Sequence, residues 1–323
     1  MYAAAVHEGK TRHEARVTSR LLSGWLEHAP EQLWIDLPEP TAEQLSELGE
    51  RFGLHPLALE ECDHTGVRPK IEQFERHLYL VLHGINHNEG ADALDTVEFK
   101  IFLWKGHLVT VHNKPSSSIR ATQERLQRDP RFLTRGGVDT VLHHIVDAVV
   151  DHYFPILERL EAELDQIEEQ LFQDGGTELL ERMLQLQRRF LTVQRLIHPQ
   201  LDVLGALSSG RFPEVESEDL AYFRDVYDHL QRIHERVQVS REMLTGAMQC
   251  YLTQVSNRTN NVMKGLAVLA TVALPATFLT SFLGMNLEHL PGRGSPTTFW
   301  LVIGFALLLS AAVLAALRRL RWL

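Results

Sequence analysis

Residues 265–284 read GLAVLATVALPATFLTSFLG, and residues 299–317 read FWLVIGFALLLSAAVLAAL. Neither run contains an ionisable side chain. At about 1.5 Å per helical residue, each run covers the ~30 Å hydrocarbon core of a bilayer. The alternative is a pair of helices buried in a large soluble core, but two adjacent charge-free runs of this length are difficult to bury in that way. We therefore predict two transmembrane helices. Pro275 in the first is tolerated in lipid where neighbouring groups satisfy the freed backbone carbonyl.

Most of the basic residues near these two segments lie on one side of them. Two precede the first segment and three follow the second (Arg258 and Lys264; Arg318, Arg319 and Arg321), whereas residues 285–298 between the segments contain one acid and one base. The positive-inside rule then places both termini in the cytoplasm and residues 285–298 outside. The N-terminus has no apolar signal segment. We expect a multi-pass protein of the cell (inner) membrane, in contact with the lipid bilayer.

The composition excludes several other classes of protein. The chain has 323 residues, of which 44% are hydrophobic, and its net charge is −10, which argues against nucleic acid as a partner. Two cysteines, Cys62 and Cys250, cannot form a disulfide framework. No phosphate-binding loop, nucleophile elbow or HExxH motif is present, so we do not expect an enzyme or a cofactor.

The residues before the first span divide into three regions. Residues 1–137 are predicted to be an α/β domain, because short apolar runs at 33–38, 77–85, 97–104 and 107–112 suit strands and Thr41 is placed to cap a helix. Residues 138–217 have a helical pattern with a break at 174–176, typical of a helical hairpin. Residues 218–264 form a long stalk helix that runs directly into the first span. Together they would reach roughly 100 Å, and such a rod needs partners to bury its apolar stripe.

A chain with two spans cannot enclose a pore alone, but several copies can. At 100° per residue, six side chains of the first span and its approach fall in one arc, with Asn260 beside it: Met263, Ala267, Ala270, Leu274, Thr277 and Ser281. Val268, Val272 and Leu279 fall opposite. The smaller, more polar arc suits a pore, and equally suits close packing of helices.

The connection between the spans favours the pore. Gly284 is a good helix stop, and Gly284-Met285-Asn286 places an asparagine at the outer mouth. A ring of amide oxygens can hold a divalent cation by its water shell without the deep energy well that a ring of carboxylates would create.

At this point the sequence resembles the CorA family of divalent-cation channels. The resemblance rests on Gly284-Met285-Asn286 after the penultimate span, the long helix before it and the basic tail, residues 318–323. It continues in Arg68-Pro69-Lys70, in Asp147-Ala148 with Asp151, in residues 222–229 (YFRDVYDH) and in residues 256–260 (SNRTN). It implies a homopentameric funnel that conducts Mg²⁺, with Co²⁺ and Ni²⁺ as further ions, driven by the membrane potential.

The resemblance also implies roles for individual residues. Gly284, Met285 and Asn286 correspond to the selectivity filter. Asn260, Met263 and Leu266 correspond to rings at the cytoplasmic end of the pore, and Leu274 and Thr277 to mid-pore positions. Asp225 corresponds to the stalk carboxylate that binds a regulatory cation between protomers. Asn88, with Glu89 beside it, stands where the family has that carboxylate's acidic partner.

The outer loop departs from the magnesium pattern. Leu290-Pro291 is followed by Gly292-Arg293 instead of an acid, and Glu288 remains as the only carboxylate of the loop. This Pro-Gly loop is similar to the ZntB branch, so a Zn²⁺ transporter, with or without proton coupling, is the alternative function. A second alternative is a membrane-anchored cation sensor or scaffold that conducts nothing.

Three further clusters were considered as sites. His143, Asp147 and Asp151 have a spacing that can bind zinc, although the family resemblance favours a structural helix face. The acidic run at 158–169 suits a solvated surface, or a surface that concentrates cations near the pore. Residues 60–64 (EECDH) resemble a ligand cluster, but adjacent side chains point in different directions.

Overall fold

The computed structural model describes residues 1–14, 30–86, 94–171, 176–284 and 296–319. Its contacts divide the chain into two compact units, residues 1–246 and residues 247–323. The expected fold class is confirmed: an α/β region, a long helix and two apolar helices at the C-terminal end are all present.

The N-terminal unit contains a seven-stranded sheet in the order β2-β1-β3-β7-β6-β5-β4. Every neighbouring pair is antiparallel except β3 and β7, which run parallel. The strands are β1 (Tyr2–His7), β2 (Lys10–Glu14), β3 (Gln32–Pro38), β4 (Lys70–Gln73), β5 (Leu78–Asn86), β6 (Asp95–Trp104) and β7 (His107–His112). The four strands expected from the sequence are β3, β5, β6 and β7.

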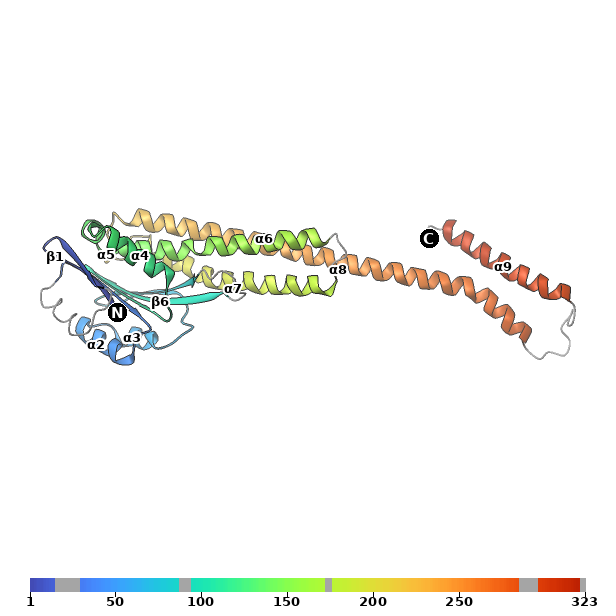
Figure 1. Ribbon diagram of the computed structural model, residues 1–323, viewed down its shortest axis with the longest axis horizontal. Coiled ribbons are helices and arrows are strands. Elements are labelled where there is room, and N and C mark those ends of the chain that lie inside the picture. Colours follow the sequence, from blue (N-terminus) through green and yellow to red (C-terminus); the bar gives the residue numbers. More distant parts are fainter. Residues whose placement is uncertain (15–29, 87–93, 172–175, 285–295, 320–323) are drawn as a thin grey trace. The chain divides into compact units, whose positions relative to one another are not determined.

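Helices cover both faces of this sheet (Figure 1). On one face lie α2 (Ala42–Phe52) and α3 (Pro56–Cys62). Thr41 caps α2 as predicted, since its hydroxyl accepts from the Gln44 N–H while the Gln44 side chain accepts from the Thr41 N–H. Leu45 and Leu48 of α2 join the core under Ile35 of β3.

The other face carries α4 (Ser117–Arg128) and α5 (Arg131–Asp151). The Gln123 side chain of α4 donates a hydrogen bond to Asp36, which follows Ile35 on β3. Successive side chains of this strand therefore point to opposite faces of the sheet. The parallel neighbours β3 and β7 therefore send the chain to opposite faces of the sheet, β3 into α2 and β7 into α4.

The helical hairpin is divided into separate helices. Helix α5 is kinked at Gly137, whose backbone is non-helical with φ +65°, so a short helical segment from Arg131 precedes a second helical segment that runs from residue 138 to Asp151. The chain breaks at His152 before α6 (Tyr153–Leu171), which pairs with α7 (Thr177–Leu207). Within this unit, the first part of α8 (Leu220–Gly284) forms the Arg236–Glu161 ion pair. It also buries an apolar stripe at helical spacing, formed by Phe223, Val226, Leu230, Ile233 and Val237.

In the C-terminal unit, α8 (Leu220–Gly284) continues without interruption to Gly284, and α9 (Pro296–Arg319) follows. Helix α9 starts three residues before the predicted span at 299, since proline suits the first helical position, where its missing N–H has no intrahelical partner. Both helices are long and apolar enough to cross a membrane. The Ser310 hydroxyl of α9 donates to the Val272 carbonyl of α8 at 3.1 Å.

Candidate functional site

The first candidate site is the face of α8 that α9 leaves uncovered. Helix α9 lies against the side of α8 that carries Val272 and Leu279, because Ser310 bonds the Val272 carbonyl and Leu279 lines a groove with residues of α9. Val268, Val272 and Leu279 are accordingly half-buried. These are the three side chains that the sequence placed opposite the smaller, more polar arc.

The arc itself is exposed in the single chain. In the arc, Met263 and Leu274 are 62% and 64% exposed, and Thr277 and Ser281 are exposed as well. Next to the arc, Leu266 is 62% exposed, and Asn260 and Gly284 are also exposed. Large apolar side chains at this exposure are unfavourable in water, so this face needs lipid or further copies of the chain. The Thr277 hydroxyl bonds the Ala273 carbonyl at 3.0 Å, which satisfies its donor within the helix.

Polar residues gather where the arc begins. Asn257, Asn260, Asn261 and Lys264 line a shallow groove on α8 together with Met263. Carboxamide oxygens next to an apolar ring provide both an ion ligand and a constriction that can exclude water. Met285, Asn286, Glu288, Asn88 and Glu89 lie outside the described residues.

The second candidate site is a cluster of two carboxylates and an imidazole. Asp147 and Asp151 of α5 and His229 of α8 each offer a ligand atom, and these atoms all lie within 4.8 Å of one another. Asp147 and Asp151 are one helical turn apart, so they share a face of α5, and α8 brings His229 onto that face. Two oxygens and a nitrogen at this separation can coordinate a divalent cation.

Without a bound cation, the negative charges of Asp147 and Asp151 repel each other. Burial, and then the negative charge of Asp151, raise the pKa of Asp147, while the neighbouring His143 and His229 lower it. Asp225 stands beside the cluster, with its carboxylate 3.7 Å from His229 Nε2, and its side chain is 67% exposed. It therefore remains available to a ligand from outside its own chain.

His143 does not join the cluster, although its spacing from Asp147 is that of a metal ligand. Its ring lies 5.4 Å from that of Tyr222 and 5.8 Å from that of Phe223, and burial lowers its pKa. In the structure, the two carboxylates that the sequence grouped with His143 are joined by His229 instead. The sequence marked His229 only as the last residue of the segment 222–229 that resembles the family, one helical turn after Asp225, and not as a metal ligand.

Residues 60–64 do not form a metal site either. Glu61 bonds Lys70 Nζ at 2.8 Å, and Cys62 donates its thiol to the Ala58 carbonyl at 3.3 Å. Burial raises the pKa of the Cys62 thiol to about 12, which keeps it protonated and a poor ligand. The His64 carbonyl accepts from the buried ammonium of Lys100.

Comparison with known proteins identifies a family over most of the chain. The family described as CorA-like Mg²⁺ transporter protein matches residues 31–319. The cobalt/magnesium transport protein CorA of Thermotoga maritima is 31% identical over 276 residues, which cover 85% of this chain and 79% of that protein.

Two solved structures show the same fold. The complete structure of the CorA magnesium transporter from Methanocaldococcus jannaschii has a TM-score of 0.83 at 24% identity, covering 100% of this chain and 99% of its own. The ZntB cytoplasmic domain from Vibrio parahaemolyticus has a TM-score of 0.65 at 16% identity, covering 80% of this chain and 98% of its own. At these identities the likeness concerns the fold alone.

Proposed function

The chain belongs to the family of CorA-like Mg²⁺ transporter proteins, and from that premise we propose that it forms a homopentameric channel for divalent metal cations. Mg²⁺ is the proposed principal ion, Co²⁺ and Ni²⁺ also pass, and the membrane potential drives the flux. A transporter named for cobalt and magnesium is the relative that supports this choice of ions.

The uncovered face of α8 is the observation that carries the proposal. Helix α9 occupies the side with Val272, so the opposite side, with Met263, Leu274 and Thr277, is free to meet the same face of other copies. Copies arranged around one axis would then line a pore with this face and turn α9 toward lipid.

Along that pore each ring has a distinct task. Asn260 offers amide oxygens at the cytoplasmic end. Met263 and Leu266 form apolar rings that close the pore by excluding water. Leu274, Thr277 and Ser281 line its middle, and the filter Gly284-Met285-Asn286 holds the hydrated cation at the outer end, with Glu288 beside it. This order assumes that both termini lie in the cytoplasm of a cell whose inner membrane holds the channel, as the basic flanks favour.

We assign the regulation of the channel to the cluster of two carboxylates and an imidazole on α5 and α8. A cytoplasmic divalent cation held by Asp147, Asp151 and His229 would relieve the mutual repulsion of the two carboxylates. The exposed Asp225 would hold a second cation together with Asn88 and Glu89 of the neighbouring copy. Because Asn88 carries no charge, we expect that second site to be weak.

Thiol modification of single-cysteine variants tests the pore face. The background replaces Cys62 and Cys250 with serine, and Thr277→Cys is compared with the matched control Leu279→Cys, which lies on the α9 side. In proteoliposomes, a charged methanethiosulfonate reagent should block Mg²⁺ uptake through Thr277→Cys and leave Leu279→Cys unaffected. Equal block of both variants, or of neither, would contradict the assignment of the pore face.

The sequence of the outer loop favours a second candidate ion. Gly292-Arg293 in place of an acid reduces the cation-attracting field at the mouth, as in a ZntB-like Zn²⁺ transporter with or without proton coupling. Uptake of Mg²⁺, Co²⁺, Ni²⁺ and Zn²⁺ should be compared with and without a pH gradient. Zn²⁺ uptake that depends on the gradient would favour the ZntB function, and no uptake of any ion would favour a sensor or scaffold.

A further inference from the structure

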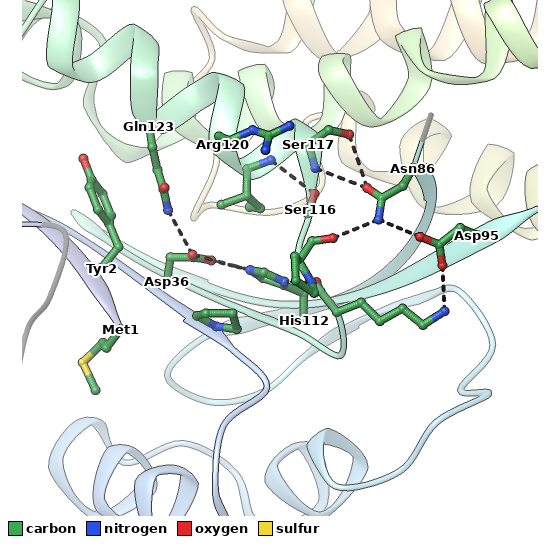
Figure 2. Close-up of a pocket in the computed structure, with 14 residues that line it drawn as sticks. Met1, Tyr2, Asp36, Asn86, Asp95, His112, Ser116, Ser117, Arg120 and Gln123 are labelled. Atoms are coloured by element: carbon green, nitrogen blue, oxygen red, sulfur yellow. Dashed lines mark hydrogen bonds and ion pairs between the residues drawn. The ribbon is translucent and has the colours of Figure 1, made fainter. Parts of the chain in front are cut away.

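A buried pair of ionisable side chains, Asp36 and His112, lies in the N-terminal unit outside both candidate sites (Figure 2). Asp36 is on β3 and His112 ends the neighbouring strand β7, and the two residues are only 2% and 3% exposed. Both line a cavity of about 580 Å³. Removal from water disfavours the charged forms of both groups, so a buried pair of this kind has to be stabilised by its surroundings.

Both ring nitrogens of His112 face oxygen atoms. Nδ1 lies 2.5 Å from the Lys114 carbonyl oxygen, and Nε2 lies 3.2 Å from Oδ1 of Asp36. A carbonyl and an ionised carboxylate only accept hydrogen bonds, so both contacts are satisfied only when both nitrogens carry a proton. A neutral imidazole has a single N–H and would turn a lone pair toward one of the two oxygens. The geometry therefore requires the imidazolium form of His112.

The groups around Asp36 hold it as a carboxylate. It accepts hydrogen bonds from the Thr110 hydroxyl at 2.6 Å and from Nε2 of Gln123 on α4 at 3.1 Å. The Thr110 oxygen accepts from the indole N–H of Trp34 at 3.2 Å, so its own proton is left for Asp36. Because donors surround this carboxyl group, it stays ionised and favours the charged ring beside it.

The other groups that face the ring of His112 favour the same state. Burial lowers the pKa of His112, but the hydrogen bond to Asp36, the charge of Asp36, the hydrogen bond to the Lys114 carbonyl and the charge of Glu39 together raise it above its ordinary value. From β6, the ring of Phe99 packs at 6.0 Å and brings no charge. The remaining ionisable residues that line the cavity are Tyr2, Asp95, Lys114 and Arg120.

The charged ring bears on α4 through two contacts. Asp36, which the ring neutralises, accepts the hydrogen bond from Gln123 in the second half of α4. Lys114, whose carbonyl the ring bonds, belongs to the short segment between the end of β7 and the first residue of α4, Ser117. Figure 2 shows the line of contacts from Gln123 through Asp36 to His112. The state of one imidazole thus affects how α4 is attached to the sheet.

We propose that the pair of Asp36 and His112 is a pH-sensitive clamp, which holds α4 on the sheet while His112 is protonated and loosens it when the ring loses a proton. The proton passes to water or hydroxide in the cavity. One N–H is then missing, so either the Lys114 carbonyl or Asp36 faces a lone pair, and the buried carboxylate has lost its countercharge. Asp36 turns toward water in the cavity, which breaks its hydrogen bond from Gln123.

The stabilisation by the clamp has a definite direction with pH. Because the pKa of His112 in the folded chain is raised above 6.5, the contribution is complete below about pH 6.5 and is lost as the pH rises through the folded value. Other histidines of this unit have lowered pKa values and destabilise the folded chain at acid pH instead: His77, His83, His143 and His144. A test of the clamp must therefore be local and must compare variants.

Hydrogen exchange of the full chain in detergent, read by mass spectrometry at about pH 6 and about pH 9, tests the clamp. Exchange of the α4 amides is expressed relative to the unprotected rate at the same pH, which removes the direct effect of hydroxide. In the parent, this protection should fall about tenfold at the higher pH, the effect of losing one hydrogen bond to a charged group. The amides of β5 should keep their protection and serve as the internal reference.

Two variants and one control complete the experiment. Asp36→Asn and His112→Gln each remove the charge of one partner, so the protection of α4 should no longer change between the two pH values. The matched control is His107→Gln on the same strand, where the ring stacks on Trp104 and Nδ1 bonds the Lys105 carbonyl at 3.0 Å. This control should keep the dependence on pH that the parent shows.

Three results would overturn the proposal. The first is equal protection of α4 in the parent at both pH values, which needs no variant. The second is a parent-like dependence on pH in Asp36→Asn. The third is loss of that dependence in His107→Gln to the same extent as in Asp36→Asn. Asp36→Asn changes the shape of the side chain least, so it decides the test if His112→Gln fails to fold, which the unfolding temperature of each variant checks.

Discussion

Replacing Asp147 with asparagine should remove most of the stabilisation that Mg²⁺ gives to the N-terminal unit. The parent has two carboxylates and one imidazole whose ligand atoms lie within 4.8 Å of one another. For a site of this kind we take a dissociation constant of about 1 mM. Binding to the folded state alone then adds about 1.8 kcal/mol at about 20 mM Mg²⁺. In a unit of this size that raises the unfolding temperature by roughly 4–7 °C.

Asp147→Asn leaves one carboxylate, Asp151, and one imidazole, His229. With one charge fewer, a tenfold weaker site is expected, so the same Mg²⁺ concentration adds only about 0.7 kcal/mol, or roughly 1–3 °C. Without cations the variant should be at least as stable as the parent. Burial and the charge of Asp151 raise the pKa of Asp147, so its ionised form is a cost to the fold that a neutral isostere avoids.

Thermal unfolding of the full chain in detergent measures both effects, with ionic strength matched by a monovalent salt. The control is Asp228→Asn, an exposed carboxylate next to His229 that is not part of the cluster. It should keep the full shift with Mg²⁺. If Asp147→Asn and Asp228→Asn lose the shift equally, the stabilisation comes from general screening of negative charge, and the reasoning from the cluster is wrong.

Three further outcomes are expected in proteoliposomes. Asn286→Ala should abolish uptake of Mg²⁺ while the oligomer stays assembled on a sizing column, because the amide oxygens of the filter are lost; undiminished flux would contradict the filter. Met263→Asp should wet the apolar ring and raise the leak at rest, measured as uptake without a potential, and a parent-like leak would move the gate toward Leu274. Asn88→Asp should strengthen closure by internal Mg²⁺, and Asp225→Ala should remove that gain; tight closure of the parent at low concentration would show that the second regulatory site does not depend on the missing charge.

The parts of this fold that the sequence predicts are those with a strong local signal. The spans within 265–284 and 299–317 follow from the absence of charge, and the cap at Thr41 from one side chain and its neighbour three residues on. Strand β1 was missed, because Ala3, Ala4 and Ala5 favour a helix and become a strand only through pairing with β2 and β3.

The candidate sites, too, were predictable only where a local sequence pattern marks them. The arc of α8 that carries Leu274 and Thr277 could be drawn from helical spacing alone, and its role in a pore stays a prediction. The cluster of Asp147, Asp151 and His229 could not be predicted from the sequence, because His229 reaches the two carboxylates only through the packing of α8 on α5. For the same reason no pattern in the sequence joins Asp36 to His112, which meet only after β3 and β7 have paired.

The two edges of the sheet bear on how copies of this chain can associate. Strands β2 and β4 end the described sheet, and both are short and charged, with Lys10, Arg12 and Glu14 on one and Lys70 and Glu72 on the other. An edge strand presents unpaired backbone groups to any other strand, and charged side chains on a short edge oppose such pairing. The sheet is therefore protected against edge-to-edge growth, and association of copies is left to the helices.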